Sequence, residues 1–320
     1  MAEILKSIKL DSVPQSFARI DPNGNHVLYK HLPYYADIIS SHIQGFTKAY
    51  VNGQEYSLFT HDSNITNYGW IIRKSEPDAK KYKEKRTPSD LQHPAGMQAI
   101  GKYVFAACEY DSCSTILIYD ASQEELPVIS VRSFEHPASS CGITDFKYNG
   151  KTRYVLAVNA NPKCHFYISE DSDTTDIENM NFVKLGELDL SAFSKEADDF
   201  EGMGLVTDKN NNVFLITMFS RGDHLTYGDY AMLLGIEIKL SDSKPSISGV
   251  HYETKHFTSR GSVAGVDGVH FRWGTGVYVS EQDGLCIVAT ARNILSLGAN
   301  KLDTNIWSEC TKVSPEPSEE

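Results

Sequence analysis

The sequence predicts an all-β fold and, within that class, a single β-propeller built from four-stranded blades. Two observations support this prediction. Short strand-like segments recur along the chain, and a Gly-apolar element recurs among them at a regular distance. Short strands repeated at a period of about 40 to 50 residues are typical of propellers.

The strand-like segments are short, rich in Val, Ile, Phe and Tyr, and separated by clusters of Asn, Asp, Gly, Ser and Pro, as expected for strands joined by turns. They occupy residues 103–109, 115–120, 127–134, 153–159, 164–169, 212–219, 231–238, 276–282 and 285–291. Helical patterns are scarce. The best helix candidate, residues 190–200, is brief and lies between strands.

A Gly followed by a large apolar residue opens five of these strand groups. The elements are IQGFTKAY, PAGMQAIG, SCGITDFK, FEGMGLVT and VDGVHFRW, with glycines Gly45, Gly96, Gly142, Gly202 and Gly268. Their spacing of about 46 to 66 residues suits one four-stranded blade each. The innermost strand of a blade lies in the crowded centre of the ring, where a residue without Cβ lets neighbouring backbones approach.

The repeat favours five blades, with six as the alternative. Residues 16–32 resemble a strand hairpin, and we expect this N-terminal segment to close the ring against the last blade, which removes open sheet edges. Residues 1–310 are therefore predicted to form one domain, followed by a disordered tail at 311–320. The charged segment 74–92 is expected to be a solvated loop or a poor outer strand.

Charge and composition limit the partners. A formal net charge of −12 argues against nucleic acid and anionic membranes, because a groove that neutralises phosphates needs the opposite sign. The N-terminus lacks a signal-peptide pattern, no apolar run approaches membrane-spanning length, and the six cysteines show no zinc-type spacing. We therefore expect a cytoplasmic protein with a small-molecule partner.

Propeller geometry predicts where polar residues meet. The innermost strand begins at one mouth of the ring, and the second strand ends at that same mouth. His93, Glu109 and Glu201 are the candidate catalytic residues: His93 can titrate near neutral pH, and desolvation at the end of an apolar strand would raise the pKa of Glu109. Glu201 and Asp267 occupy the same place in their repeats, and paired carboxylates can act as acid and base or hold a metal.

Other polar and aromatic residues are expected around the same mouth as substrate contacts. These are His61, Trp70, Asn159, Arg221, Tyr227, Asp267 and Glu281. Each candidate also has a structural alternative: a hydrogen-bonded core histidine, a packed aromatic ring, a rim salt bridge, or an acid that accepts from backbone N–H groups.

The stretch HPAGMQAIGKYVFAACE (93–109), followed by ILIYD and later by FEGMGL (200–205), resembles a loose group of β-propeller proteins from fungal natural-product clusters. This group includes the trichothecene-cluster propeller and the hetero-Diels–Alderases of tropolone meroterpenoid pathways. The resemblance covers roughly residues 93–290. It implies a cofactor-free pocket that binds a reactive apolar intermediate and directs its dehydration or cyclisation. Within this group, His93 and Glu201 are the positions to inspect for catalytic roles.

Three functions remain open at this point. The first is an enzyme without a cofactor that uses His93, Glu109 or Glu201 for acid–base chemistry. The second is a hydrolase or lactonase that depends on Ca²⁺ or Mg²⁺ held by oxygen ligands. The third is a non-catalytic module that binds glycans or another ligand, although the mouth positions differ from blade to blade and so favour one central site.

Overall fold

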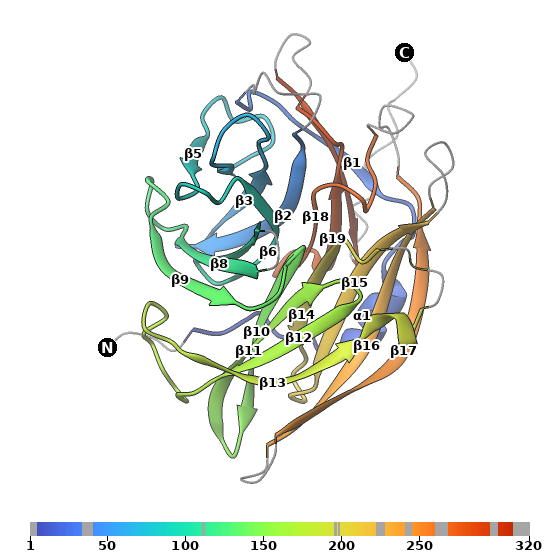
Figure 1. The fold of residues 1–320 in the computed structure, drawn as a ribbon. Helices are drawn as coiled ribbons and strands as arrows, with labels where there is room; N and C mark the ends of the chain where they lie inside the picture. The colour runs from blue at the N-terminus through green and yellow to red at the C-terminus, as the bar shows by residue number, and fades with distance from the viewer. Residues whose placement is uncertain are drawn as a thin grey trace.

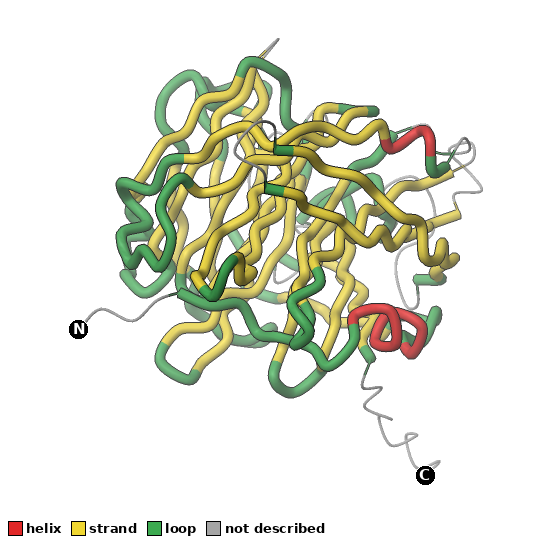
Figure 2. Tube along the Cα trace, turned by 90° about the horizontal axis from the view of Figure 1, so that it is seen from below, coloured by secondary structure: helices red, strands yellow, loops and turns green. Residues whose placement is uncertain are grey.

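The computed structural model describes residues 5–33, 41–110, 113–194, 197, 199–221, 228–240, 245–259, 268–294 and 300–309. Within these residues, helix is confined to α1 (Val13–Arg19) and the 3-10 turn η1 (Leu190–Ala192), and strands dominate the molecule (Figure 2). None of the helices in this part of the chain has the length and apolar character needed to cross a bilayer. The predicted tail at 311–320 lies outside the described residues.

The strands form five four-stranded antiparallel blades, each wound outwards from an innermost strand; a parallel contact of β18 with β2, Thr275 opposite Gly45, joins blades 5 and 1 into one eight-stranded sheet. Blade 1 holds β2 (Ile43–Val51), β3 (Gln54–His61), β4 (Trp70–Lys74) and β5 (Lys83–Arg86). Blade 2 holds β6 (His93–Ile100), β7 (Tyr103–Tyr110), β8 (Cys113–Asp120) and β9 (Val128–Phe134). Blade 3 holds β10 (Ser140–Tyr148), β11 (Lys151–Ala160), β12 (Lys163–Ser169) and β13 (Phe182–Asp189). Blade 4 holds β14 (Gly202–Thr207), β15 (Val213–Arg221), β16 (Gly228–Lys239) and β17 (Ser246–Phe257). Blade 5 holds β18 (Thr275–Ser280), β19 (Gly284–Thr290), β20 (Leu302–Ser308) and β1 (Asn25–Tyr29).

The blades close into a ring. Each innermost strand contacts the next in the cyclic order β2, β6, β10, β14, β18 and back to β2, and the five lie around a common centre (Figure 1). β1 is the outermost strand of blade 5 and pairs antiparallel with β20, from Asn25 opposite Ile306 to Tyr29 opposite Leu302. The prediction of an all-β propeller with five blades is therefore confirmed.

The apolar core lies between neighbouring blades. Leu58 of blade 1 packs with Val104 and Leu117 of blade 2, and equivalent clusters fill the other interfaces. Because a blade has a neighbour on each side, its inner strands bury both faces, and β7 is buried at every residue from Val104 to Cys108. Continuous apolar runs, rather than alternating ones, follow from this double burial.

The innermost strands touch through glycine. A Cβ on Gly45 would lie 2.7 Å from the Ala95 carbonyl oxygen, and a Cβ on Gly276 would overlap the Phe46 carbonyl oxygen. The expectation that Gly268 supplies the fifth repeat glycine is wrong, because β18 begins at Thr275 and Gly276 is the residue that meets blade 1. Both segments share a Gly-Val pair, and only the closure of the ring distinguishes them.

Two further expectations need correction. Residues 16–32 do not form a hairpin, since Val13–Arg19 is helix α1; the Ser12 side chain caps its start by accepting from the Gln15 backbone N–H at 3.4 Å. The helix candidate at 190–200 forms only the turn η1 within the described residues. The charged segment 74–92 contributes β5, which is a short outer strand.

The centre of the ring is bridged by one amide. The buried Gln98 side chain on β6 donates to the Leu205 carbonyl at 2.9 Å and accepts from the backbone N–H groups of Ile143 at 2.7 Å and Leu205 at 2.9 Å. It thereby joins three blades across the channel.

The segment before α1 lies over the far mouth, where the Ser7 backbone N–H donates to Asp145 at 2.6 Å. The near mouth, where the innermost strands begin, holds the candidate site.

Candidate active site

A cavity of about 300 Å³ lies at the near mouth, at the start of the innermost strands. It is lined by His42, Gln44, His93, Ala95, Glu109, Ser139, Glu201, Arg272 and Trp273. These residues come from every blade or from the loops that enter them. All three candidate catalytic residues predicted from the sequence, His93, Glu109 and Glu201, line this one cavity.

The pairing of β6 with β7 brings His93 and Glu109 together. His93 is the first residue of β6, Glu109 lies near the end of β7, and the two are direct partners in the strand register. His93 Nδ1 lies 3.4 Å from Glu109 Oε2, and both side chains are about one-third exposed. The start of an innermost strand and the end of the next strand thus meet at one mouth.

The ionisation of this pair is coupled. Burial lowers the pKa of His93, but the hydrogen bond to Glu109 and the charges of Asp62 and Glu109 outweigh it, so the net pKa is raised. The same hydrogen bond lowers the pKa of Glu109. The expectation that desolvation raises the pKa of Glu109 is therefore wrong, because His93 supplies a partner that stabilises the carboxylate.

His42 is a further residue of the cavity, which the sequence did not predict. Its ring lies on the other side of Gln44 from His93: the Gln44 amide nitrogen is 2.7 Å from Nε2 of each ring. His42 Nδ1 lies 3.4 Å from Oδ2 of Asp62, and Asp62 is almost fully buried. Burial first, and then the nearby charge of His93, lower the pKa of His42 to about 3, so this ring is neutral at ordinary pH.

Glu201 is held in place through the residue before it. The Phe200 carbonyl accepts from the Asn161 amide at 3.1 Å and also from the Asn159 amide, and the Phe200 N–H donates to Asn161 Oδ1 at 2.9 Å. The Glu201 N–H donates to the Met218 carbonyl at 2.9 Å. The carboxyl group enters the cavity from this fixed backbone.

The environment of Glu201 changes its chemistry. Burial, assisted by the charge of Asp199, raises the pKa of Glu201 to about 7, although Arg272 opposes the shift. A carboxyl group with this pKa is present in both forms near neutral pH and is a much stronger base than an exposed glutamate. A perturbed carboxyl group that lines a cavity is typical of an active site.

Trp273 forms the aromatic wall of the cavity. Its ring lies edge-on to His42 at 5.1 Å between centroids. The guanidinium groups of Arg272 and Arg292 lie 5.5 and 5.2 Å from the Trp273 ring centroid. Arg272 and Trp273 belong to the VDGVHFRW element, which the sequence predicted to be a strand. In the structure they lie in the connection before β18, and this connection runs along the near mouth.

The residues predicted to contact the substrate lie in several different parts of the molecule. Asn159 is buried beneath the cavity and holds Phe200, while its amide also donates to Ser139 Oγ at 2.8 Å. His61 is buried and donates from Nδ1 to the Asp62 carbonyl at 2.6 Å, and Trp70 packs edge-on against it at 6.0 Å. Arg221 is exposed at the end of β15. None of these four residues lines the cavity.

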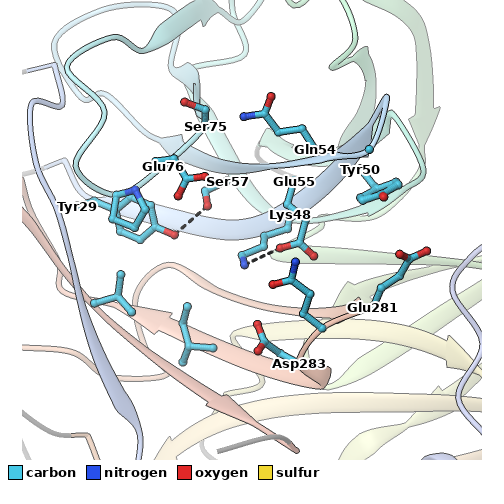
Figure 3. A pocket seen from close by; sticks show the side chains of 15 residues that line it. Tyr29, Lys48, Tyr50, Gln54, Glu55, Ser57, Ser75, Glu76, Glu281 and Asp283 are labelled. Atoms are coloured by element: carbon cyan, nitrogen blue, oxygen red, sulfur yellow. Dashed lines mark hydrogen bonds and ion pairs between the residues drawn. The ribbon is translucent and has the colours of Figure 1, made fainter. Parts of the chain in front are cut away.

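Tyr227 and Asp267 lie outside the described residues. Glu281 lies at the opposite face of the ring, because residues 276–282 belong to the innermost strand and its turn rather than to a second strand. It lines a separate cavity of about 420 Å³, and Figure 3 shows it there with Asp283 and with Lys48 and Glu55, whose charged groups are 2.9 Å apart. The expected placement of Glu281 at the near mouth is therefore wrong.

Metal ligands were one alternative use of the mouth carboxylates. Among the described residues, no group of three or more His, Cys, Asp and Glu side chains has an arrangement that could hold a metal ion. Asp267, which belonged to the expected pair with Glu201, lies outside that part of the chain. The arrangement at the near mouth is instead one of separate proton-carrying groups: a His–Glu pair, a buried His–Asp pair, and Glu201.

Comparisons with known proteins add little to this description. No protein-family model and no curated protein matches the sequence. Among solved structures, the chain is similar to Zg3597, a family 117 glycoside hydrolase produced by the marine bacterium Zobellia galactanivorans, with a TM-score of 0.46 and 9% identity over 91% of this chain and 92% of that chain. A likeness this distant carries no argument about function. Strand pairing and the mouth geometry define the protein as a five-bladed propeller with a cluster of titratable side chains at one mouth.

Proposed function

We propose that this propeller is an enzyme that transfers protons on a small molecule bound at the near mouth, in a dehydration or cyclisation reaction. The observation that supports it most directly is that His93 and Glu201 line one cavity and carry pKa values raised for different reasons. Ion pairing favours the imidazolium form of His93. Burial makes Glu201 a stronger base. One residue is thus suited to give a proton and the other to take one.

The proposed step balances for a β-hydroxy carbonyl compound. The Glu201 carboxylate takes the proton from the carbon beside the carbonyl, and the electron pair of that C–H bond forms the new C=C bond. The C–O bond at the next carbon breaks, and the leaving oxygen takes the proton of His93 and departs as water. Glu201 then returns its proton to His93 through solvent, which restores both groups.

The cavity suits a compact molecule with both polar and apolar parts. Its volume of about 300 Å³ is at the lower end of small-molecule sites. Trp273 provides an apolar face, and the charges of Arg272 and of protonated His93 are offset by Glu109 and Glu201. A site with balanced charge favours a neutral ligand such as an apolar biosynthetic intermediate, and proton transfer of this kind needs no cofactor.

Turnover of a panel of β-hydroxy ketones, followed by the absorbance of the enone product, tests this proposal. We expect His93→Gln and Glu201→Gln each to lower kcat by about 10²-fold or more, which is the usual contribution of a general acid or base. Glu281→Gln is the matched control, because it removes a carboxylate at the far face. Turnover that survives both near-mouth substitutions would remove the assigned roles.

A further inference from the structure

We propose that Gln44 is a positioning residue whose amide forces His42 and His93 into the same tautomer and so governs when His93 can take a second proton. This inference rests on the proposed role of His93 as the acid. It follows from the unusual position of the amide, which contacts the same ring atom, Nε2, of both histidines. Gln44 itself makes no proposed contact with the reacting atoms.

Five side chains form one continuous row. The Gln44 amide nitrogen lies 2.7 Å from Nε2 of His42 and 2.7 Å from Nε2 of His93. On the outer side of each ring, Nδ1 faces a carboxylate at 3.4 Å, which is Asp62 for His42 and Glu109 for His93. The row therefore runs Asp62, His42, Gln44, His93, Glu109, with the amide at its centre.

Counting donors determines the resting state of the row. An amide NH₂ group has two hydrogens and no acceptor, so it can serve both rings only if each Nε2 offers a lone pair. Each neutral ring then carries its proton on Nδ1, where it points towards a carboxylate. In this state the amide donates to both rings and each Nδ1–H faces a carboxylate oxygen at 3.4 Å; for His42 this contact with Asp62 is electrostatic and is not a hydrogen bond.

A second proton on His93 breaks this pattern. The imidazolium ring has a hydrogen on both nitrogens, so its Nε2–H would face the N–H of Gln44 at 2.7 Å, which is closer than the other neighbour of Nε2, Asp62 Oδ2 at 3.6 Å. The amide must rotate by half a turn and present its oxygen, which can accept from both rings. His42 must then move its proton from Nδ1 to Nε2, since an amide oxygen facing the bare His42 nitrogen would leave two acceptors in contact.

The coupling acts through the tautomer of His42 because this ring stays uncharged while His93 titrates. Burial lowers the pKa of His42 to about 3, so the ring is neutral throughout the range in which His93 titrates. The charged or titratable groups that face His93 are Glu109 from β7, Asp62 after β3, and His42 before β2. Glu201 and Arg272 line the same cavity.

Nuclear magnetic resonance of ¹⁵N-histidine in the full, unliganded chain tests this inference, because ring nitrogen shifts identify the tautomer of each histidine between about pH 5 and 9. In the wild type we expect both rings to carry Nδ1–H at high pH. As His93 gains its second proton, the His42 proton should move to Nε2 with the same midpoint.

Two substitutions at Gln44 make the test specific. Gln44→Glu places a carboxylate between the rings, so the His93 midpoint should move up by about one pH unit or more. Gln44→Leu removes both hydrogen bonds, so the His42 tautomer should no longer follow His93. Gln54→Glu, which adds the same charge at an exposed position of the far face, should change neither signal.

The inference is overturned if the two rings of the wild type carry different tautomers at high pH, or if the His42 tautomer is constant while His93 titrates. It also fails if Gln44→Leu leaves the linkage intact. These outcomes differ from a failure of the proposed function. Unlinked tautomers with turnover still lost in His93→Gln reject only the role of Gln44, whereas linked tautomers with turnover intact in that variant reject only the catalytic proposal.

Discussion

Asn161 holds Phe200 by both of its backbone groups, and this clamp sets the position of Glu201. The Asn161 amide donates to the Phe200 carbonyl at 3.1 Å, and its oxygen accepts from the Phe200 N–H at 2.9 Å. Asn211 clamps the backbone of Lys147 in the same way in a hairpin turn of blade 4. The described residues thus offer two clamps of the same pattern: the Asn161 clamp is part-buried beside the cavity, and the Asn211 clamp is exposed.

The first prediction separates positioning from stability. Asn161→Ala should lower the free energy of unfolding by about 1–3 kcal/mol, since the Phe200 N–H loses its partner and the Phe200 carbonyl keeps only the Asn159 amide. It should also lower turnover, because the backbone before Glu201 is held less firmly. Asn211→Gly, which suits the left-handed backbone at that residue (φ 70°), should cost less stability because its hydrogen bonds are exposed, and should cause no loss of turnover. Denaturant unfolding and the enone assay measure the two effects. Equal turnover in both variants would show that the clamp does not position Glu201.

The second prediction concerns ring closure. Gly276→Ala places a methyl group against the Phe46 carbonyl, so blade 5 must move away from blade 1. Overpacking of this kind costs about 1–3 kcal/mol, and we expect a larger loss here because backbone cannot rotate aside. Gly150→Ala serves as control, since its added Cβ meets nothing within 4 Å and only its φ of +78° is strained. A Gly276 variant with the stability of the Gly150 variant would contradict the close approach.

The third prediction concerns the centre of the ring. Gln98→Leu leaves the N–H groups of Ile143 and Leu205 and the Leu205 carbonyl without their partner in a buried site. An unsatisfied buried group costs about 1–3 kcal/mol, so the free energy of unfolding should fall by at least about 2 kcal/mol. Gln54→Leu, at an exposed position, should cost little. If urea unfolding gave both variants the same midpoint, the bridging amide would have no stabilising role.

The fourth prediction is a pH dependence of stability. The folded-state pKa of Glu201, about 7, is above the ordinary glutamate value of 4.5, so between these values the folded state binds the proton more tightly. The contribution of Glu201 to stability is therefore full below about pH 4.5 and is lost as pH rises towards 7. Glu201→Gln should remove this part of the pH dependence and gain stability relative to the wild type as pH rises. If the free energy of unfolding changed equally with pH in the two proteins from about pH 5 to 8, the raised pKa of Glu201 would be contradicted.

Local sequence patterns were sufficient for the fold class and for part of the site. Strand composition and the spacing of Gly45, Gly96, Gly142 and Gly202 predicted the blades, because each strand and turn is encoded within a few residues. The rule that an innermost strand begins where its partner ends brought His93 beside Glu109. That rule failed for Glu281, because residues 276–282 were taken for a second strand. They belong to the innermost strand and its turn, so Glu281 lies at the far face of the ring.

Other features were decided by closure of the ring alone. The choice of Gly276 over Gly268 depends on contact with Phe46, which is more than 200 residues away in the chain. His42 lies in a loop without a repeating pattern, and Trp273 lies in an element that was assigned to a strand, so neither was predicted at the mouth. Only packing of the blades brings the buried Asp62 against His42 and fixes their ionisation, because burial and the distance between charges are properties of the assembled ring and not of any segment.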